Sequence, residues 1–275
     1  MTKPAVLLVS RLPEPLGGRL RARFDCHELA QLDAAGLQAL APQLCGMEAT
    51  GESVVSRALM ASLPALEVIS VLGVGYDGIA MAAARERGIC VAHTPGLSTH
   101  DIADFAMALL LAAARQVVNA DQFVRRGDWS TGRHPMTRRV SGARLGIVGL
   151  GRIGRGEAQR ALAFGMEIAY TGRTVNADVL AALEPSGVLV NIARGSIVDE
   201  DALITALRER QILAAGLDVL CHEPHVPQGL LVLDNVVLTP HMASTTGATV
   251  QAMFDLTFDN LAAHFDGLPV PTPVA

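Results

Sequence analysis

A glycine-rich turn is the clearest chemical feature of the sequence. Gly149-Leu150-Gly151-Arg152-Ile153-Gly154 has the spacing G-x-G-x-x-G, and it lies between the apolar run Leu145 to Val148 and a helical pattern. In that context the glycines allow a tight turn, a close approach of the backbone to a pyrophosphate, and close packing of helix on strand. The N–H groups of the helix start then face the anion. The motif predicts a dinucleotide site, the alternative being an ordinary glycine-rich turn, and the residues of the predicted site are Gly149, Gly151, Arg152, Ile153 and Gly154.

The end of the next predicted strand bears on the choice of cofactor. An NAD site places an acidic residue there, about 20 residues after the glycine turn, to bind the ribose 2′-hydroxyl. This sequence reads Tyr170-Thr171-Gly172-Arg173-Thr174, without an acidic residue. Arg173 could pair with the 2′-phosphate of NADP, although an exposed surface arginine is the simpler alternative. We therefore expect a preference for NADPH, with NAD as a second option.

Three further segments are more specific than the glycine turn. They are Val71-Leu72-Gly73-Val74-Gly75-Tyr76-Asp77, Val190-Asn191-Ile192-Ala193-Arg194-Gly195-Ser196 and Leu238-Thr239-Pro240-His241. In this order they resemble the D-isomer-specific 2-hydroxyacid dehydrogenase family, especially its hydroxypyruvate, glyoxylate and hydroxyphenylpyruvate reductases. The resemblance covers almost the whole chain. It implies an NAD(P)-dependent enzyme that reduces a small 2-oxo acid to the D-2-hydroxy acid.

The resemblance also implies the roles of individual residues. Arg194, Glu223 and His241 match the catalytic set of the family. Asp218 matches the residue that contacts the nicotinamide carboxamide, and Ala193 is expected beside the cofactor as well.

The reaction explains why these residue types are needed. Reduction of a 2-oxo acid requires a fixed cation for the carboxylate and carbonyl oxygens, and a proton donor for the oxygen that becomes an alkoxide. Arg194 would supply the cation and His241 the proton, while Glu223 would orient the imidazole and favour its protonated form. Backbone N–H groups of Val74 and Gly75, in a glycine-flanked turn, could bind the substrate carboxylate.

Each of these residues, taken singly, could be structural or exposed. Together they follow successive predicted strands, where α/β sheets bind ligands, and this favours catalysis. The competing hypothesis is a non-catalytic dinucleotide-sensing or partner-binding protein on the same fold, because a fold does not by itself determine activity.

The elements that must position these residues follow an alternating pattern. Short β-rich runs alternate with helical patterns in the first hundred residues, which predicts an α/β fold with a parallel sheet wrapped by helices. The resemblance implies a flavodoxin-like substrate-binding domain over residues 1–97, completed by a C-terminal helix in 246–275. It implies a Rossmann-type dinucleotide-binding domain over residues 98–245. The alternating segments run Ala5 to Val9, Gly36 to Leu44, Leu66 to Leu72, Ile79 to Arg87 and Ile89 to Ala92.

The second domain is expected to begin with a buried helix from about Ile102 to Val118. A polar excursion from Arg125 to Val140 carries Trp129 and lies at the surface or at a subunit contact. Together with the resemblance, these segments lead us to expect a homodimer. A short helix is predicted at Asn176 to Leu183, and strands are predicted at Leu145 to Val148, Glu167 to Thr171, Val188 to Ile192, Ala214 to Val219 and Val236 to Leu238.

One part of the dinucleotide domain departs from the family pattern. Only Thr174 to Gly187 separate the second predicted strand from the strand that carries Asn191. A third strand, its helix and a fourth strand are therefore missing, since a single βαβ unit takes about 30 residues. A short connection would have to cross the domain. We therefore expect a chain break between Gly172 and Ala177 and a protein of ordinary family size; a continuous chain would favour the sensor hypothesis.

Composition excludes several other classes. The formal net charge of −5 leaves no basic surface for nucleic acid. The most apolar segment falls short of the roughly 20 residues that cross a bilayer, and no signal peptide is evident. The cysteines are widely spaced and form no metal motif, which is typical of reduced thiols in the cytoplasm; they are Cys26, Cys45, Cys90 and Cys221.

Overall fold

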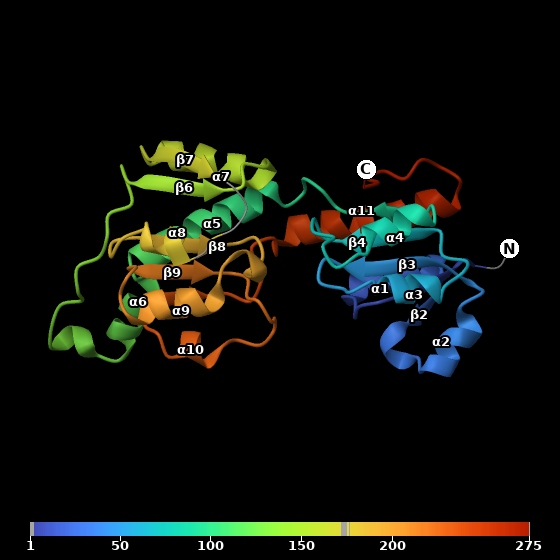
Figure 1. Cartoon of the computed structure of the whole chain (residues 1–275), viewed down its shortest axis with the longest axis horizontal. Helices are drawn as coiled ribbons and strands as arrows, with labels where there is room; N and C mark the ends of the chain where they lie inside the picture. The colour runs from blue at the N-terminus through green and yellow to red at the C-terminus, as the bar shows by residue number, and fades with distance from the viewer. Residues whose placement is uncertain (1–2, 172–174, 176, 275) are drawn as a thin grey trace. The chain divides into compact units, whose positions relative to one another are not determined.

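The computed structural model describes residues 3–171, 175 and 177–274, whose contacts divide the chain into two units (Figure 1). Unit 1 comprises Met1–Ser98 and Thr246–Ala275, and unit 2 comprises Thr99–Thr245. These bounds differ from the expected ones by one residue. Both units are α/β with parallel strands, as the alternating pattern predicts. No helix in the described part of the chain is long and apolar enough to cross a membrane.

Unit 1 contains a five-stranded parallel sheet in the order β2-β1-β3-β4-β5. This is the flavodoxin-like order. The sequence pattern missed β2 and β3 because β2 reads Asp-Cys-His-Glu at a polar sheet edge, and β3 contains a glycine and a glutamate. The strands are β1 (Ala5–Leu8), β2 (Asp25–Glu28), β3 (Leu44–Thr50), β4 (Val68–Leu72) and β5 (Cys90–Ala92).

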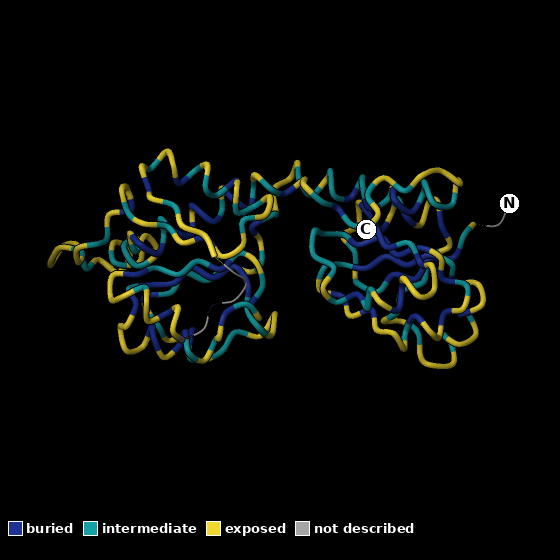
Figure 2. The backbone as a smooth tube through the Cα atoms, turned by 45° about the horizontal axis from the view of Figure 1, so that its top comes forward, coloured by how far each residue is buried: buried dark blue, intermediate teal, exposed yellow. Residues whose placement is uncertain are grey.

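Two apolar layers cover the faces of this sheet, and the strands lie buried between them in Figure 2. Side chains alternate between the faces along each strand: Val6 packs with α1 and α11, whereas Leu7 packs with α3 and α4. Thr246 caps the start of α11 by accepting a hydrogen bond from the Thr249 amide. The helices are α1 (Glu14–Arg23), α2 (Ala34–Leu40), α3 (Arg57–Ala61), α4 (Met81–Glu86) and α11 (Gly247–Phe265).

Unit 2 begins with the buried helix α5 (Thr99–Ala114). The expected helix to Val118 is interrupted, because Gln116 has a left-handed backbone (φ 50°) and a second helix, α6 (Val117–Arg125), starts after it. The segment that follows α6 is largely exposed, in agreement with the expected polar excursion: Trp129 is 68% and Met136 100% exposed.

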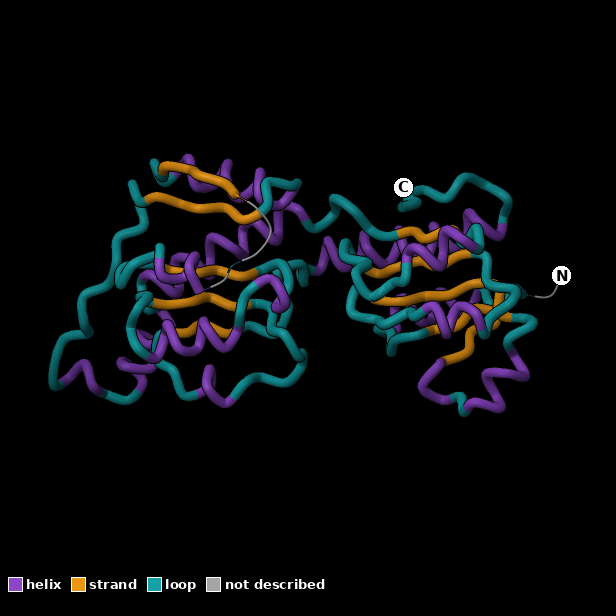
Figure 3. The backbone as a smooth tube through the Cα atoms, viewed as in Figure 1, coloured by secondary structure: helices purple, strands orange, loops and turns teal. Residues whose placement is uncertain are grey.

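Unit 2 contains two separate parallel sheets (Figure 3). One pairs β6 (Arg144–Val148) with β7 (Glu167–Thr171), which are connected through α7 (Arg152–Ala163). The other has the order β10-β9-β8. Its elements are α8 (Ala177–Ala181), β8 (Val188–Asn191), α9 (Glu200–Arg208), β9 (Ala214–Leu217), α10 (Gln228–Leu231) and β10 (Val236–Leu238).

Helix α5 links the two sheets. Leu145 on β6 and Val190 on β8 both pack against the apolar cluster that contains Met107 and Leu110 of α5. Among the described residues, no strand ladder joins β6 to β8. The two sheets therefore share a covering helix but not backbone hydrogen bonds, as if a central strand of one sheet were missing.

The chain break that we expect between Gly172 and Ala177 stays a prediction. The sequence has 275 residues, and the structure covers residues 1–275. The proposed break between Gly172 and Ala177 falls mostly on positions 172–174 and 176, which lie outside the described residues. No further strand lies between β7 and β8 among the described residues, which is why the sheet of unit 2 is interrupted.

Candidate functional site

The carboxyl ends of the three strands in the β10-β9-β8 sheet carry the predicted catalytic residues. Arg194 follows β8, Glu223 lies in the loop after β9, and His241 follows β10. Parallel strands place their carboxyl ends at one edge of a sheet, which is where open α/β sheets bind ligands. All three residues belong to unit 2, and the sheet brings their chain segments to a common edge.

His241 and Glu223 form the central contact of this edge. His241 donates through Nδ1 to the Glu223 carboxylate at 2.7 Å, and both side chains are about a third exposed or less (31% and 26%). The second carboxylate oxygen accepts from the backbone N–H of Leu220 at 2.8 Å. Because Nδ1 is engaged by the carboxylate, the orientation of the imidazole is fixed.

The backbone of His241 is in the left-handed region (φ 49°), which is uncommon for a residue other than glycine. Asp218 holds this turn. Its carboxylate, on a residue only 1% exposed, accepts from the Thr239 hydroxyl (2.6 Å) and from the amides of Met242 and Ala243 (both 2.9 Å). The His241 amide donates to the Asp218 carbonyl at 2.8 Å. The turn that carries the imidazole is thus tied to the end of β9.

Asn191 holds the turn that carries Arg194. Its amide donates to the Arg194 carbonyl at 2.8 Å and its side-chain oxygen accepts from the Ala193 amide at 3.1 Å. Next to it, Gly195 approaches the loop after β9 so closely that a Cβ would lie 2.0 Å from the Leu220 carbonyl carbon. The Arg194 turn and the Glu223 loop are therefore packed backbone against backbone.

The glycine turn after β6 has the geometry that a pyrophosphate requires. Gly149 has φ 91°, which favours glycine, and nothing lies within 4 Å of the Cβ positions of Gly149 and Gly151. A Cβ at Gly154 would lie 2.2 Å from the Gly149 carbonyl oxygen, so helix and turn pack closely. Helix α7 begins at Arg152, with no side-chain cap from Gly151. The first N–H groups of the helix are therefore available to an anion.

The structure gives the positions of two of the other predicted cofactor residues, Ile153 and Ala193, but not that of Arg173. Ile153 lies in the first turn of α7, and Ala193 is exposed in the turn after β8. Arg173 lies outside the described residues. The geometry of the glycine turn thus fits a pyrophosphate, and the contact of Arg173 to a 2′-phosphate stays a prediction.

Val74 and Gly75 follow β4 in unit 1, and this segment is built as a fixed turn. Gly73 has φ 139°, and its N–H donates to the Thr94 hydroxyl at 3.1 Å. His93 donates through Nδ1 to the Val74 carbonyl at 2.9 Å. The bond from His93 uses the carbonyl of Val74 and not the N–H groups of Val74 and Gly75 that are expected to bind the substrate, so that role also stays a prediction.

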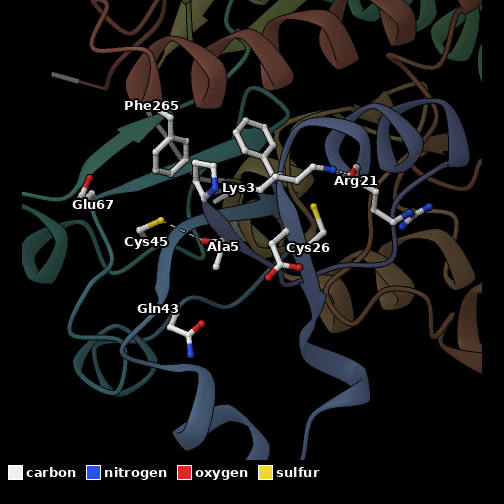
Figure 4. Close-up of a pocket in the computed structure, with 11 residues that line it drawn as sticks. Lys3, Ala5, Arg21, Cys26, Gln43, Cys45, Glu67 and Phe265 are labelled. Atoms are coloured by element: carbon white, nitrogen blue, oxygen red, sulfur yellow. Dashed lines mark hydrogen bonds between the residues drawn. The ribbon is translucent and has the colours of Figure 1, made fainter. Parts of the chain in front are cut away.

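A depression in unit 1 lies away from these residues (Figure 4). It has a volume of about 900 Å³ and opens at the amino ends of β1 to β4, opposite the edge where parallel sheets bind ligands. Its arginine, Arg21, pairs with Glu14 and Glu28, and Lys3 donates to the Arg21 carbonyl. The cationic groups of this depression are thus engaged within the protein.

Sequence reasoning did not single out Asn191, Thr239 or Gly195 as site residues. A signal was present for the first: Asn191 is a polar residue at the end of the apolar strand Val188–Asn191. The partners of Thr239 and Gly195 lie on neighbouring strands or loops, which the sequence does not pair, whereas the side chain of Asn191 bonds within its own turn.

Comparison with known proteins gives a consistent result. A family model described as D-isomer specific 2-hydroxyacid dehydrogenase, NAD binding domain, matches residues 107–178 and 170–243. The 2-ketogluconate reductase of Gluconobacter oxydans is 38% identical over 309 residues, covering 99% of each chain. The hydroxyphenylpyruvate reductase of Plectranthus scutellarioides is 40% identical over 252 residues, covering 78% of this chain and 80% of the relative.

Solved structures are also similar over the whole chain. A 2-hydroxyacid dehydrogenase from Ketogulonicigenium vulgare has a TM-score of 0.93 at 39% identity, covering 100% of this chain and 99% of the other. An NADPH-dependent glyoxylate/hydroxypyruvate reductase from Sinorhizobium meliloti, in complex with NADP and malonate, has a TM-score of 0.92 at 38% identity, covering 100% and 97%.

The alignments also locate the missing segment. The alignment with the Gluconobacter protein spans 309 residues, 34 more than this chain contains. The two stretches matched by the family model meet and overlap at residues 170–178. That overlap coincides with the junction between β7 and α8, where the sheet is interrupted.

Proposed function

Because this chain belongs to the D-isomer specific 2-hydroxyacid dehydrogenase family, we propose that it reduces a small 2-oxo acid to the D-2-hydroxy acid, with NADPH as preferred cofactor and NAD as a second one. The observation that carries the proposal is the hydrogen bond between His241 and Glu223 at the sheet edge that also carries Arg194. Relatives named as glyoxylate, hydroxypyruvate, hydroxyphenylpyruvate and 2-ketogluconate reductases define the substrate class.

His241 is the proposed general acid. Glu223 accepts the Nδ1 proton and keeps the imidazole in one orientation, so Nε2 delivers the proton to the carbonyl oxygen of the substrate. Arg194 binds the carboxylate and the carbonyl oxygen, and stabilises the negative charge that develops on that oxygen. The nicotinamide, when bound, supplies hydride to the carbonyl carbon.

The glycine turn is the proposed pyrophosphate site. The N–H groups at the start of α7 and the open space above Gly149 and Gly151 fit a dianionic group without further side chains. Arg173 is proposed to bind the 2′-phosphate, which agrees with the NADPH dependence printed for the Sinorhizobium enzyme. Ala193 and Asp218 are proposed to lie beside the nicotinamide, and Val74 and Gly75 to bind the substrate carboxylate.

We further propose a homodimer through unit 2 and a cytoplasmic location. Apolar side chains are exposed along the segment after α5, where Val117, Val124, Trp129 and Met136 are each more than half exposed, and such a patch supports a protein contact. The cysteines in the described part of the chain are free thiols, which supports a reducing compartment.

The interrupted sheet favours a second candidate function, dinucleotide binding without turnover. The crevice in which an open α/β sheet binds a dinucleotide lies at the point where strand order reverses. Here that point lies between β6 and β8, where no ladder joins the described strands. A sensor needs the glycine turn, but it does not need the proton donor.

One assay separates the two functions. NADPH oxidation is followed with glyoxylate, hydroxypyruvate, hydroxyphenylpyruvate and 2-ketogluconate, and NADPH binding is measured by calorimetry on the same protein. Turnover of any of these acids supports the reductase. NADPH binding without turnover of any of them would establish the sensor instead.

A further inference from the structure

We infer that Asn191 is a positioning residue for substrate binding: its side-chain amide sets the conformation of the turn that presents Arg194. The inference deepens the proposed function and rests on it, because it assigns a cause to the placement of the substrate-binding cation. Asn191 itself would touch neither substrate nor cofactor. It is 6% exposed and lies at the end of β8.

Both polar atoms of the Asn191 side chain are used within its own turn. Nδ2 donates to the Arg194 carbonyl (2.8 Å) and Oδ1 accepts from the Ala193 amide (3.1 Å). The side chain therefore closes a ring across residues 191–194 with one donor and one acceptor. Only an amide of this length offers both groups at once, since a carboxylate only accepts and a hydroxyl is shorter.

The backbone of Asn191 connects this turn to the rest of the site. Its carbonyl accepts from the Asp218 amide at 2.9 Å, and Asp218 in turn holds the His241 turn. The Arg194 turn also packs on the loop after β9 through Gly195. A change in the 191–194 turn is therefore expected to move the guanidinium relative to the imidazole, while most of the sheet stays as it is.

Asn191→Asp is the most informative variant. The carboxylate keeps the acceptor for the Ala193 amide but loses the donor to the Arg194 carbonyl. Protonation of the carboxyl restores an O–H donor. Burial raises the pKa of such a carboxyl, so this restoration is expected within the measurable range.

A matched control exists in the same unit. Asn235 is 4% exposed, and its Nδ2 donates to two backbone carbonyls, those of Leu207 at 3.2 Å and Leu213 at 3.1 Å. It precedes β10, so it lies at the opposite edge of the sheet from His241. Asn235→Asp creates the same chemical change at the same burial, away from the site.

The experiment measures KM and kcat for an accepted 2-oxo acid between pH 5 and 8 in wild type and both variants, with thermal unfolding alongside. At pH 8 we expect Asn191→Asp to lower kcat/KM by about 10- to 100-fold, mainly through KM, because one buried carbonyl loses its donor and Arg194 is displaced. At pH 5, kcat/KM of Asn191→Asp should return toward the wild-type value. Asn235→Asp should lose thermal stability in the same pH-dependent way and keep the KM of wild type.

The ratio of kcat/KM in the variant to kcat/KM in wild type, taken at each pH, isolates the effect of the substitution at position 191. The charged groups of the adjoining turns are the same in all three proteins; they are Arg194, Glu200, Asp218, Glu223 and His241. The inference would be overturned if the kcat/KM ratio of Asn191→Asp to wild type did not change with pH. It would also be overturned if Asn235→Asp changed KM as much as Asn191→Asp does. If Asn191→Asp does not fold, Asn191→Ser with Asn235→Ser replaces the pair, and a wild-type KM in Asn191→Ser would overturn it. A wild type without turnover would instead overturn the proposed function, and the inference with it.

Discussion

At the scale of single residues, His241 offers the most direct test of the proposed chemistry. His241→Ala removes the proton donor and should lower kcat by a factor of about 100 to 10,000, the range typical of lost general acid catalysis. Dinucleotide binding, measured by calorimetry, should stay close to that of wild type. His222→Ala is the control, because His222 is exposed in the loop after β9 and is expected to leave kcat unchanged. Unchanged turnover in His241→Ala would end the proposed mechanism.

Arg173 tests the choice of cofactor. If it binds a 2′-phosphate, the protein should bind NADPH more tightly than NADH. Arg173→Ala should then reduce the difference in binding free energy between NADPH and NADH by about 1.5 to 3 kcal/mol, the usual range for a hydrogen bond to a charged group. The measurement is the Kd for each cofactor in both proteins, with Arg139→Ala as an exposed control in unit 2. Equal affinities of the parent protein for NADPH and NADH would contradict the assignment.

At the scale of elements, the contact between two loops sets how closely the Arg194 turn approaches the Glu223 loop. A Cβ at position 195 would lie 2.2 Å from the Leu220 carbonyl oxygen and 2.3 Å from the Cys221 nitrogen. Both atoms are backbone, so they cannot move aside as a flexible side chain would. Glycine is therefore required at position 195 for close approach.

Gly195→Ala is expected to push the Glu223 loop away from the Arg194 turn. We expect kcat/KM to fall by about 10- to 100-fold and the melting temperature to drop, because overpacking of this kind costs about 1 to 3 kcal/mol. Gly132→Ala is the matched control, since nothing lies within 4 Å of its Cβ position. Equal activities of the two variants would show that the loop adapts to the added methyl group.

The interrupted sheet is the main departure of an element from the family pattern. Central strands of parallel sheets are normally buried on both faces. In β7, by contrast, Tyr170 is 67% exposed, and in β6 Val148 is 36% exposed. These exposures are explained by the missing elements, which in a complete domain would pair with or cover the same strands.

At the scale of the whole molecule, a buried carboxyl makes stability depend on pH. Glu48 on β3 is fully buried, and neither of its carboxylate oxygens has a hydrogen-bond partner among the described residues. Its side chain shares a strand face with Gly46, which packs on Phe265 of α11. Burial raises the pKa of Glu48 to about 8, so the folded protein keeps this carboxyl neutral at neutral pH.

The sign of the effect follows from the raised pKa. Below about pH 4.5 the carboxyl is protonated in both folded and unfolded states, so the free energy of unfolding is unaffected. It should fall by roughly 4 kcal/mol as pH rises from there to about 8. Burial also raises the pKa of Glu157 in α7, to about 7, which adds a smaller loss of the same sign.

Glu48→Gln removes the larger of these two contributions. Urea unfolding at pH 5, 7 and 8.5 should show a flatter profile for the variant, with the variant more stable than wild type at pH 8.5. Glu209→Gln, at an exposed position, is the control and should follow wild type. Parallel profiles for wild type and Glu48→Gln would show that Glu48 does not titrate between folded and unfolded states.

The sequence by itself determined the features that depend on local order. The turn from Gly149 to Gly154 was recognisable because its function depends on glycines at three spacings next to a strand. Arg194, Glu223 and His241 were identified through motifs that follow strands, and β7 and β10 have the predicted bounds. Such features are contained in a few consecutive residues, so no knowledge of distant partners was needed.

Only the tertiary structure decided the features that depend on which strands are neighbours. The bonds from Asp218 to the His241 turn and the contact of Gly195 with Leu220 join segments more than 20 residues apart. Strand β2 escaped the sequence pattern because its side chains are polar, and β3 because Gly46 and Glu48 interrupt its apolar residues, which are buried in the core. The missing strand was visible in the sequence, but its consequence, two sheets that share helix α5 without a common ladder, follows from which backbone edges find partners.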